Sequence, residues 1–361
     1  MEKEILITFL VACYNSEAYL NVCLDSLLKC DNEKIEIILV DDGSKDKTYD
    51  VIMKYKNLYP NVIKVIKKEN AGHGDAINDG VKNATGKFFK IVDSDDWVNE
   101  DALNKLLNAV EQVGDKVDLF VTNYVYYHGY DNPKRRITFH STFKEHKICG
   151  WNEAKGMKIN QNLTLHSCMF KLEKVKESGV VLPKKVSYED NYFVYACLSK
   201  VRTFIYLNID FYCYLIGRDG QSVNTINCIK RYKEHLLISK LINDYLDLMA
   251  IKKIDKPLYK ILYHHLRLVM MIATIYARMN GSKEADKNFK DYKKDLKLSH
   301  KKLYDKMIYH SISGLLTVPG PFGRFFVRII FRVANIVVPF TKKEETKINK
   351  TRFKKLSKKN N

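Results

Sequence analysis

Short apolar runs alternate with amphipathic stretches through the first 130 residues of the chain. Each run is rich in β-branched and aromatic residues, which is typical of strands buried on both faces of a parallel sheet. The predicted strands are Ile5–Cys13, Ile35–Val40, Val62–Ile66, Lys87–Val92 and Asp118–Tyr127. Helical periodicity between them predicts helices on short connections. This order is typical of a doubly wound α/β unit with a mostly parallel sheet.

Beyond this unit the pattern is weaker. Asp131–Arg136 is predicted to be a turn, and two further short strands are expected to end at Tyr214. Tyr188–Leu198 has the spacing of an amphipathic helix. Residues 226–303 are helical in periodicity, with a predicted break at Pro257 because proline interrupts a helix.

The balance of charged residues changes near residue 225, where the periodicity also changes. Residues 1–225 contain 30 Lys/Arg and 31 Asp/Glu, whereas residues 226–361 contain 31 Lys/Arg and 11 Asp/Glu. We therefore predict an α/β domain at 1–225, a basic helical domain at 226–317, and an amphipathic helix with a polybasic tail at 318–361. The strong positive charge of the C-terminal part favours an anionic partner.

Several classes of protein are disfavoured. The eight cysteines lack metal-ligand spacing, so we expect reduced core thiols in a cytosolic protein. The N-terminus has no signal-peptide layout, and the longest apolar run, Leu268–Ala277, is half of the ~20 residues that span a membrane. A non-catalytic nucleic-acid-binding protein is an alternative that the basic tail suggests. It is disfavoured because the first 225 residues are nearly neutral and carry no RNA-reading motif.

Three carboxylates follow the strand Lys87–Val92 directly, at Asp93, Asp95 and Asp96. The carboxyl ends of strands are where open α/β sheets bind ligands. Because close carboxylates repel one another, Mn²⁺ or Mg²⁺ holding a diphosphate would stabilise the cluster. The alternative is that these residues cap the helix that begins near Asn99.

Polar residues follow the other strands too, and each suits one part of a nucleotide-sugar. Tyr14 offers a face for base stacking, although it could instead be a core aromatic. Asp42 can accept the N3–H of a uracil, while Asp41 is as well explained by capping the following turn as by ligand contact. Glycines after Asn70 let the backbone approach a ribose or diphosphate closely.

The order of these motifs resembles that of family 2 glycosyltransferases of the GT-A fold, over residues 5–215. The matching motifs are V-A-C-Y-N, V-D-D-G-S, N-A-G-x-G-x-A-x-N, T-G-K-F followed by D-x-D, and Glu189-Asp190 on a later helix. Bacterial wall-polymer and capsule glycosyltransferases share this layout. The resemblance implies a GT-A fold, an inverting transfer of a hexosyl or N-acetylhexosaminyl group, and a divalent metal.

The resemblance also implies roles for single residues. The donor-binding residues would be Ala12 and Tyr14 at the uracil, Asp42 at its N3, Asn70, Asp93 at the ribose, Ser94, and Arg218 and Ser222 at the diphosphate. Asp95 would be the principal metal ligand. Asp190 would be the catalytic base. Arg218 could equally be an exposed loop residue.

An inverting transfer needs a base that deprotonates the acceptor hydroxyl away from the metal. Asp190 suits that role, and Glu189 is the second candidate. Carboxylates in a first helical turn are also favoured by the helix dipole alone. His73 and the pair at 264–265 are interpreted as packing or surface residues, as is His166, which could also line the acceptor side.

The sequence therefore predicts a metal-dependent glycosyltransferase that moves a sugar from a UDP-sugar to a cell-envelope glycan or a lipid-linked acceptor. A nucleotidyltransferase is an alternative within the same fold. Such enzymes usually carry a glycine- and basic-rich loop after the first strand, whereas Cys-Tyr-Asn-Ser-Glu stands here. Pairing of two subunits through the C-terminal helices is left open.

The last prediction concerns Phe322–Phe340, where Arg324, Arg328 and Arg332 recur every four residues among apolar ones. This pattern fits a helix lying in a membrane interface. Residues 341–361 add nine Lys/Arg against two Glu, which favours an anionic leaflet. We predict peripheral attachment at the inner face of the cell membrane. The alternative is that 322–340 packs on the helical domain as ordinary core.

Overall fold

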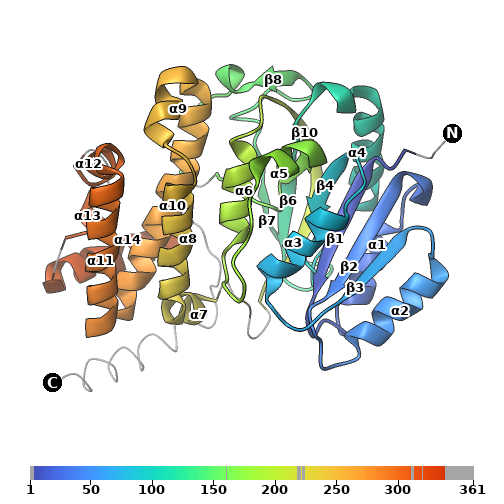
Figure 1. Cartoon of the computed structure of the whole chain (residues 1–361), viewed down its shortest axis with the longest axis horizontal. Coiled ribbons are helices and arrows are strands. Elements are labelled where there is room, and N and C mark those ends of the chain that lie inside the picture. Colours follow the sequence, from blue (N-terminus) through green and yellow to red (C-terminus); the bar gives the residue numbers. More distant parts are fainter. Residues whose placement is uncertain are drawn as a thin grey trace.

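A computed structural model of the chain describes residues 4–159, 161–217, 221, 224–309, 313–318 and 320–337. One mixed sheet with helices on its faces forms one side of the molecule, and a group of long helices forms the other (Figure 1). The predicted fold class, α/β with a mainly helical C-terminal part, is confirmed.

The first half of the sheet is parallel, in the order β3-β2-β1-β4. Its strands are β1 (Ile7–Cys13), β2 (Ile35–Asp41), β3 (Ile63–Lys67) and β4 (Phe88–Ile91). Every residue of β1, β2 and β4 is buried, which explains the nearly continuous apolar runs in the sequence. The four predicted strands here are confirmed.

Helices connect these strands and cover the sheet (Figure 1). They are α1 (Leu20–Leu27), α2 (Thr48–Leu58), α3 (His73–Asn83) and α4 (Glu100–Val113), with short 3-10 turns η1 (Asn32–Lys34) and η2 (Gly114–Lys116). The amphipathic pattern is the cause, since α4 buries its apolar face on the sheet and leaves its charged face exposed.

The second half of the sheet reverses direction at β9 (Cys168–Lys171), which pairs antiparallel with both β4 and β6. The other strands are β5 (Trp97–Val98), β6 (Leu119–Tyr127), β7 (Pro133–Ile137), β8 (Ile148–Gly150) and β10 (Thr203–Leu215). β10 runs parallel to β6, and the short β5, β7 and β8 pair antiparallel with their neighbours.

Two predictions for this half are wrong. The expected turn at 131–136 contains most of β7, a largely exposed strand that pairs with β6. Its proline and basic residues are typical of an edge strand and hide it from hydrophobic periodicity. The two short strands expected before Tyr214 are one strand, β10, whose register shifts between Leu207 and Tyr212 interrupt the alternation.

The remaining helices complete the molecule. They are η3 (Trp151–Glu153), α5 (Leu172–Ser178), α6 (Asp190–Leu198), α7 (Thr225–Lys230), α8 (Tyr232–Tyr245), α9 (Leu248–Ile254), α10 (Lys256–Asn280), α11 (Lys283–Ser299), α12 (Lys301–Tyr309), α13 (Ser313–Leu316) and α14 (Gly320–Val337). The predicted break at Pro257 is confirmed, because α9 ends before it and the proline lies in the first turn of α10.

The helices α8 and α10 lie against the α/β part, and α11 to α13 lie farther from the sheet (Figure 1). Ile238, Ile242 and Leu262 belong to the same buried apolar cluster as the strands of the sheet. The core therefore continues across residue 225, and the predicted division there stays a prediction. Within the described residues, no helix is both long enough and apolar enough to cross a membrane.

Candidate active site

The ends of β1 and β2 place the first predicted donor residues at one edge of the sheet. Tyr14 is 47% exposed, so its alternative role as a core aromatic is wrong, while Ala12 is 9% exposed at the end of β1. Asp41 is fully buried, and its Oδ1 accepts a hydrogen bond from the backbone N–H of Ser44 at 3.1 Å. Its Oδ2 has no partner among the described residues.

Asp42 holds the glycine-rich turn that begins α3. Its two carboxylate oxygens accept hydrogen bonds from the N–H groups of Ala71 and Gly72, both at 2.8 Å. Gly72 has φ +94°, and a Cβ on it would lie 2.7 Å from the backbone nitrogen of Lys185. Only glycine fits here. The turn, with exposed Asn70 beside it, is therefore fixed both by Asp42 and by the loop that precedes α6.

Hydrogen bonds also fix residues 93–96, here called the acidic segment, which follow β4. The N–H of Asp93 donates to the Tyr212 hydroxyl at 3.1 Å, and that hydroxyl donates to Asp96 at 2.8 Å. Asp96 also accepts from the N–H of Leu215 at 2.8 Å, and the hydroxyls of Ser94 and Ser16 are 2.7 Å apart. The segment is thus tied to β10.

The alternative that this acidic segment caps α4 is wrong. The N-cap of α4 is Asn99, whose side chain accepts from the N–H of Ala102 at 3.0 Å. Asp96 is instead buried beneath the strand ends, and that burial together with the charge of Asp93 raises its pKa well above the usual range. A carboxylate held under such conditions favours a nearby positive charge.

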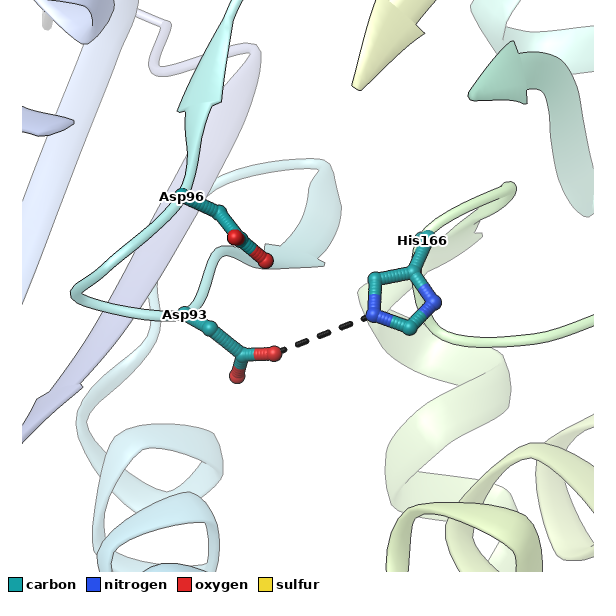
Figure 2. Close-up of side chains that lie close together, drawn as sticks. All are labelled: Asp93, Asp96 and His166. Carbon is teal, nitrogen blue, oxygen red and sulfur yellow. Dashed lines mark ion pairs between the residues drawn. The ribbon is translucent and has the colours of Figure 1, made fainter. Parts of the chain in front are cut away.

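One group of side chains in the described part of the chain could hold a metal ion. Asp93, Asp96 and His166 each offer a ligand atom, and these atoms lie within 4.8 Å of one another (Figure 2). Burial lowers the pKa of His166 to about 4, so the imidazole is neutral, as a ligand must be. Two carboxylates and one imidazole suit Mn²⁺ and also accept Mg²⁺. Asp95 is half-buried and outside this group, and its metal role stays a prediction.

Lys90, on β4, holds the backbone of the segment that carries His166. Its ammonium donates to the backbone carbonyls of Leu165, His166 and Cys168, at 2.5, 2.8 and 3.1 Å. The side chain is 1% exposed, and burial lowers its pKa to about 7. A buried lysine is stable only with such partners. Lys90 was missed because it reads as one polar residue within an apolar strand.

His73 joins the acidic segment to α6. Its Nε2 lies 3.3 Å from Asp93 Oδ1, and its Nδ1 lies 2.7 Å from Glu189 Oε1. Burial opposes the charged form, but the two carboxylates outweigh it and raise the pKa of His73 well above its usual value. The interpretation of His73 as a packing or surface residue did not anticipate these two contacts. Its place inside the glycine turn was the sequence signal that could have identified it.

The Glu189-Asp190 pair begins α6 with two different environments. Glu189 is 2% exposed and engaged by His73, and a Cβ on Gly74 would lie 2.9 Å from its Cγ. Asp190 is partly exposed and accepts a hydrogen bond from the Asn191 side chain at 3.0 Å. Burial, and then the charges of Glu189 and Asp93, raise the pKa of Asp190 to about 7.

The structure thus gathers Asp93, Ser94 and Asp96 with His73, His166 and the Glu189-Asp190 pair. It places Tyr14, Asp42 and Asn70 on the neighbouring strand ends and turns. Arg218 and Ser222 lie outside the described residues. His264 and His265 are buried in α10, as their interpretation as packing residues predicted.

The fold is similar to that of TarS from S. aureus. Crystal structures of its residues 1–349, alone and in complex with UDP-GlcNAc, superpose with TM-scores of 0.61 and 0.63 at 22% identity. Each match covers 90% of this chain, with 87% and 88% of the respective TarS chain. At this identity the likeness concerns the fold alone.

Sequence comparison adds relatives. EpsH of Bacillus subtilis, named as a glycosyltransferase, is 30% identical over 241 residues, covering 65% of this chain and 66% of EpsH. The poly(ribitol-phosphate) beta-glucosyltransferase of Bacillus spizizenii is 31% identical over 223 residues, covering 60% of this chain and 33% of that protein. The profile of Glycosyl transferase family 2 matches residues 8–174. Residues 8–174 of this chain are therefore identified as a glycosyl transferase family 2 domain.

Proposed function

We propose that this protein transfers a sugar from a UDP-sugar, with inversion, to a hydroxyl of a cell-envelope glycan or a lipid-linked acceptor. One observation carries the proposal. His73 bridges Asp93, which follows β4 on the donor side, and Glu189, which adjoins the proposed base Asp190. This bridge supports one site that combines a group able to hold a metal ion with a carboxylate whose pKa is about 7, although about a hundred residues separate them in the chain.

Asp190 acts as the base in the proposed reaction. It takes the proton from the acceptor hydroxyl as the hydroxyl oxygen attacks the anomeric carbon, and the bond from that carbon to the diphosphate breaks. A pKa of about 7 is well suited to proton transfer near neutral pH. Glu189 is the weaker candidate, because it is buried against His73. A divalent cation bound at the acidic segment would neutralise charge on the departing diphosphate.

The donor side has a distinct set of roles. Tyr14, exposed at the end of β1, offers its ring to the uracil. Asp42 fixes the turn at Asn70, and each of its oxygens keeps a lone pair for the uracil N3–H. UDP-GlcNAc bound by TarS and the glucosyltransferase name of one relative support UDP-GlcNAc and UDP-glucose as the first donors to test. That relative's name also supports a wall polymer as acceptor.

Donor identity can be measured without the acceptor. Full-length protein with Mn²⁺ is mixed with UDP-GlcNAc, UDP-glucose, UDP-galactose or GDP-mannose, and thermal stabilisation and sugar-nucleotide hydrolysis are recorded. We expect stabilisation by UDP and by one UDP-sugar, loss of both effects with EDTA, and no effect of GDP-mannose. Stabilisation by nucleoside triphosphates with pyrophosphate release would instead indicate a nucleotidyltransferase.

The helix α14 has two unlike faces. Val327 is fully buried and packs with Ile275 and Leu316, and Arg324 pairs with Asp286 at 2.9 Å. The opposite face exposes Phe325, Phe326 and Ile329 at 58%, 44% and 39%. Ordinary core packing, the alternative for residues 322–340, therefore describes the face of α14 that contains Val327 but not the opposite face. The three arginines were predicted to mark a helix lying in a membrane interface, but Arg324 pairs with α11 instead.

We propose that the exposed face, Phe325, Phe326 and Ile329, rests on the inner face of an anionic membrane. Exposed aromatic side chains beside a basic C-terminal part are typical of interfacial helices. Phe325→Ser with Phe326→Ser should lower co-sedimentation with vesicles of 30% phosphatidylglycerol. Leu298→Ser, at a 74% exposed position on α11, is the matched control. Equal pelleting of both variants, or none by the wild type, would contradict this attachment and leave the transferase proposal intact.

A further inference from the structure

The turn that carries the proposed base has an unusual backbone. Ser187–Asn191, here called the base turn, contains Tyr188 with φ +68°. A bulky side chain rarely adopts this left-handed conformation. Such a residue persists only where its surroundings hold it in place. The question is therefore which groups hold Tyr188.

The helices α7 and α8 and the residue between them hold the first part of the base turn. The N–H of Ser187 donates to Glu234 Oε2 at 2.7 Å, and Arg231 donates to the Ser187 hydroxyl. The ring of Tyr188 stacks on the imidazole of His235, with centroids 3.7 Å apart and planes at 17°. Its hydroxyl lies 3.5 Å from the sulfur of Cys228. All four partners come from the segment that contains α7 and α8.

His235 contacts Tyr188 through its imidazole ring. Its side chain is buried, and burial lowers its pKa to about 3, so the imidazole is neutral. Its Nε2 has no hydrogen-bond partner among the described residues, and its other flat neighbour is Tyr276 at 4.9 Å. Stacking of the flat ring is therefore the interaction that reaches Tyr188.

The helix α10 holds the other end of the base turn. His265 is 1% exposed, and burial lowers its pKa to about 4. Its Nε2 lies 3.0 Å from the carbonyl oxygen of Asn191, which can only accept, so the imidazole N–H is the donor. The base turn is thus held at both ends by the C-terminal helices.

The side of the base turn that faces α3 meets the donor site. Glu189 reaches Asp93 through His73, and the N–H of Lys185 donates to the carbonyl of Ala71 at 2.8 Å. Asp190 therefore lies between the glycine-rich turn that begins α3 and the C-terminal helices. A base must meet its proton within hydrogen-bond reach, and a misplacement of about 1 Å can cost about 100-fold in rate.

From this arrangement we infer that α8 and α10 serve the transfer reaction by positioning Asp190, with His235 and His265 as the positioning residues. The inference rests on the proposed role of Asp190 as base. It gives the C-terminal helices a part in catalysis in addition to any part in membrane attachment. Neither histidine touches the reacting atoms.

The first test measures the base turn itself and needs no activity. Hydrogen exchange of full-length wild type is compared with His235→Leu, which removes the stack, and with His235→Phe, which retains a flat ring. Exchange in peptides covering 185–192 should rise at least tenfold in His235→Leu and stay near the wild-type rate in His235→Phe. Peptides from β1 and β4 should not change. Unchanged exchange at 185–192 in His235→Leu would overturn the inference.

Tyr188→Gly serves if His235→Leu does not fold. Glycine adopts φ +68° without strain but has no ring to stack, so the fold should persist while exchange at 185–192 rises. Tyr188→Phe, which keeps the ring and loses only the hydroxyl, is its matched control. Equal exchange in these two variants would also overturn the inference.

The second test uses turnover. With Mn²⁺ and UDP-GlcNAc or UDP-glucose, whichever is hydrolysed, His235→Leu should lower kcat about 10- to 100-fold at unchanged affinity for UDP. A positioning residue acts through the base, so His235→Leu should add little further loss to Asp190→Asn. Full additivity would indicate general destabilisation and would overturn the inference. If Asp190→Asn alone keeps full turnover, the proposed base is wrong, while the exchange result still reports on the turn.

Discussion

The ends of β1, β2 and β4, with the residues that follow them, are here called the donor edge. The donor edge and the base turn are held in place by different kinds of contact. At the donor edge the carboxylates follow parallel strands, and Asp41 and Asp42 bind backbone N–H groups of the turns beside them. At the base turn, side chains from α8 and α10 hold Ser187, Tyr188 and Asn191 across 47 to 74 residues of sequence. Strand ends, with hydrogen bonds to neighbouring strands and turns of the sheet, place the first set. Side chains of the C-terminal helices place the second.

This difference predicts how each region responds to substitution. The donor edge should tolerate changes in the C-terminal helices, because its positions depend on the sheet. The base turn should be sensitive to them, because Glu234, His235 and His265 contact it from those helices. The His73 side chain contacts carboxylates of both regions.

The largest effect is expected at the donor edge, from Asp95→Ala. If Asp95 is the principal metal ligand, as predicted, its loss should lower transfer more than about 1,000-fold, since a metal supplies several kcal/mol at tenfold per 1.36 kcal/mol. UDP binding in Mn²⁺, measured by calorimetry, should weaken as well. Asp101→Ala, an exposed acid in the first turn of α4, is the control. Near-normal turnover of Asp95→Ala with loss in Asp96→Ala would assign the metal to Asp93, Asp96 and His166 instead.

A different signature is expected from Asp190→Asn. The change is nearly isosteric, so folding and UDP binding should persist while turnover falls by about 10²- to 10⁴-fold. Steady-state kinetics and UDP calorimetry on one preparation separate the two quantities. A defect confined to the donor KM would place Asp190 on the donor side and make Glu189 the candidate base, which would remove the distinction between the regions.

The contrast also explains what the sequence could predict. The strands, the acidic segment and the glycine turn have local patterns, so their place at one sheet edge followed from strand order. His73, Lys90 and His235 have no local pattern, because each acts on a group that is remote in the chain. A strained Tyr188 is likewise invisible to periodicity, which reports the burial of faces and not a single φ.

The pH dependence should reflect the base turn more than the donor edge. The proposed base Asp190 must be deprotonated to accept a proton, and its pKa is raised to about 7. We therefore expect kcat/KM to fall about tenfold per pH unit below 7 and to level off above it. Glu189→Gln should move the midpoint to lower pH, because it removes a negative charge that raises the pKa of Asp190. A profile that is flat between pH 5 and 7 in the wild type would contradict this role.

The smallest effect is expected from Lys90→Met, a buried change within the sheet. Three carbonyls would lose their donor, which should lower the free energy of unfolding by about 1–3 kcal/mol. Because burial lowers the folded pKa of Lys90 to about 7, the unfolded state binds more protons between pH 7 and 10. Wild-type stability therefore gains from rising pH there, and its advantage over Lys90→Met should widen. Urea unfolding at pH 7 and pH 9 measures this difference, with Lys82→Met as control, because the Lys82 side chain is 74% exposed.

The same variant tests whether the donor edge is independent of the base turn. If it is, Lys90→Met should weaken Mn²⁺ binding through His166 and leave hydrogen exchange at 185–192 unchanged. Faster exchange there would mean that the two regions are coupled through the sheet as well as through His73.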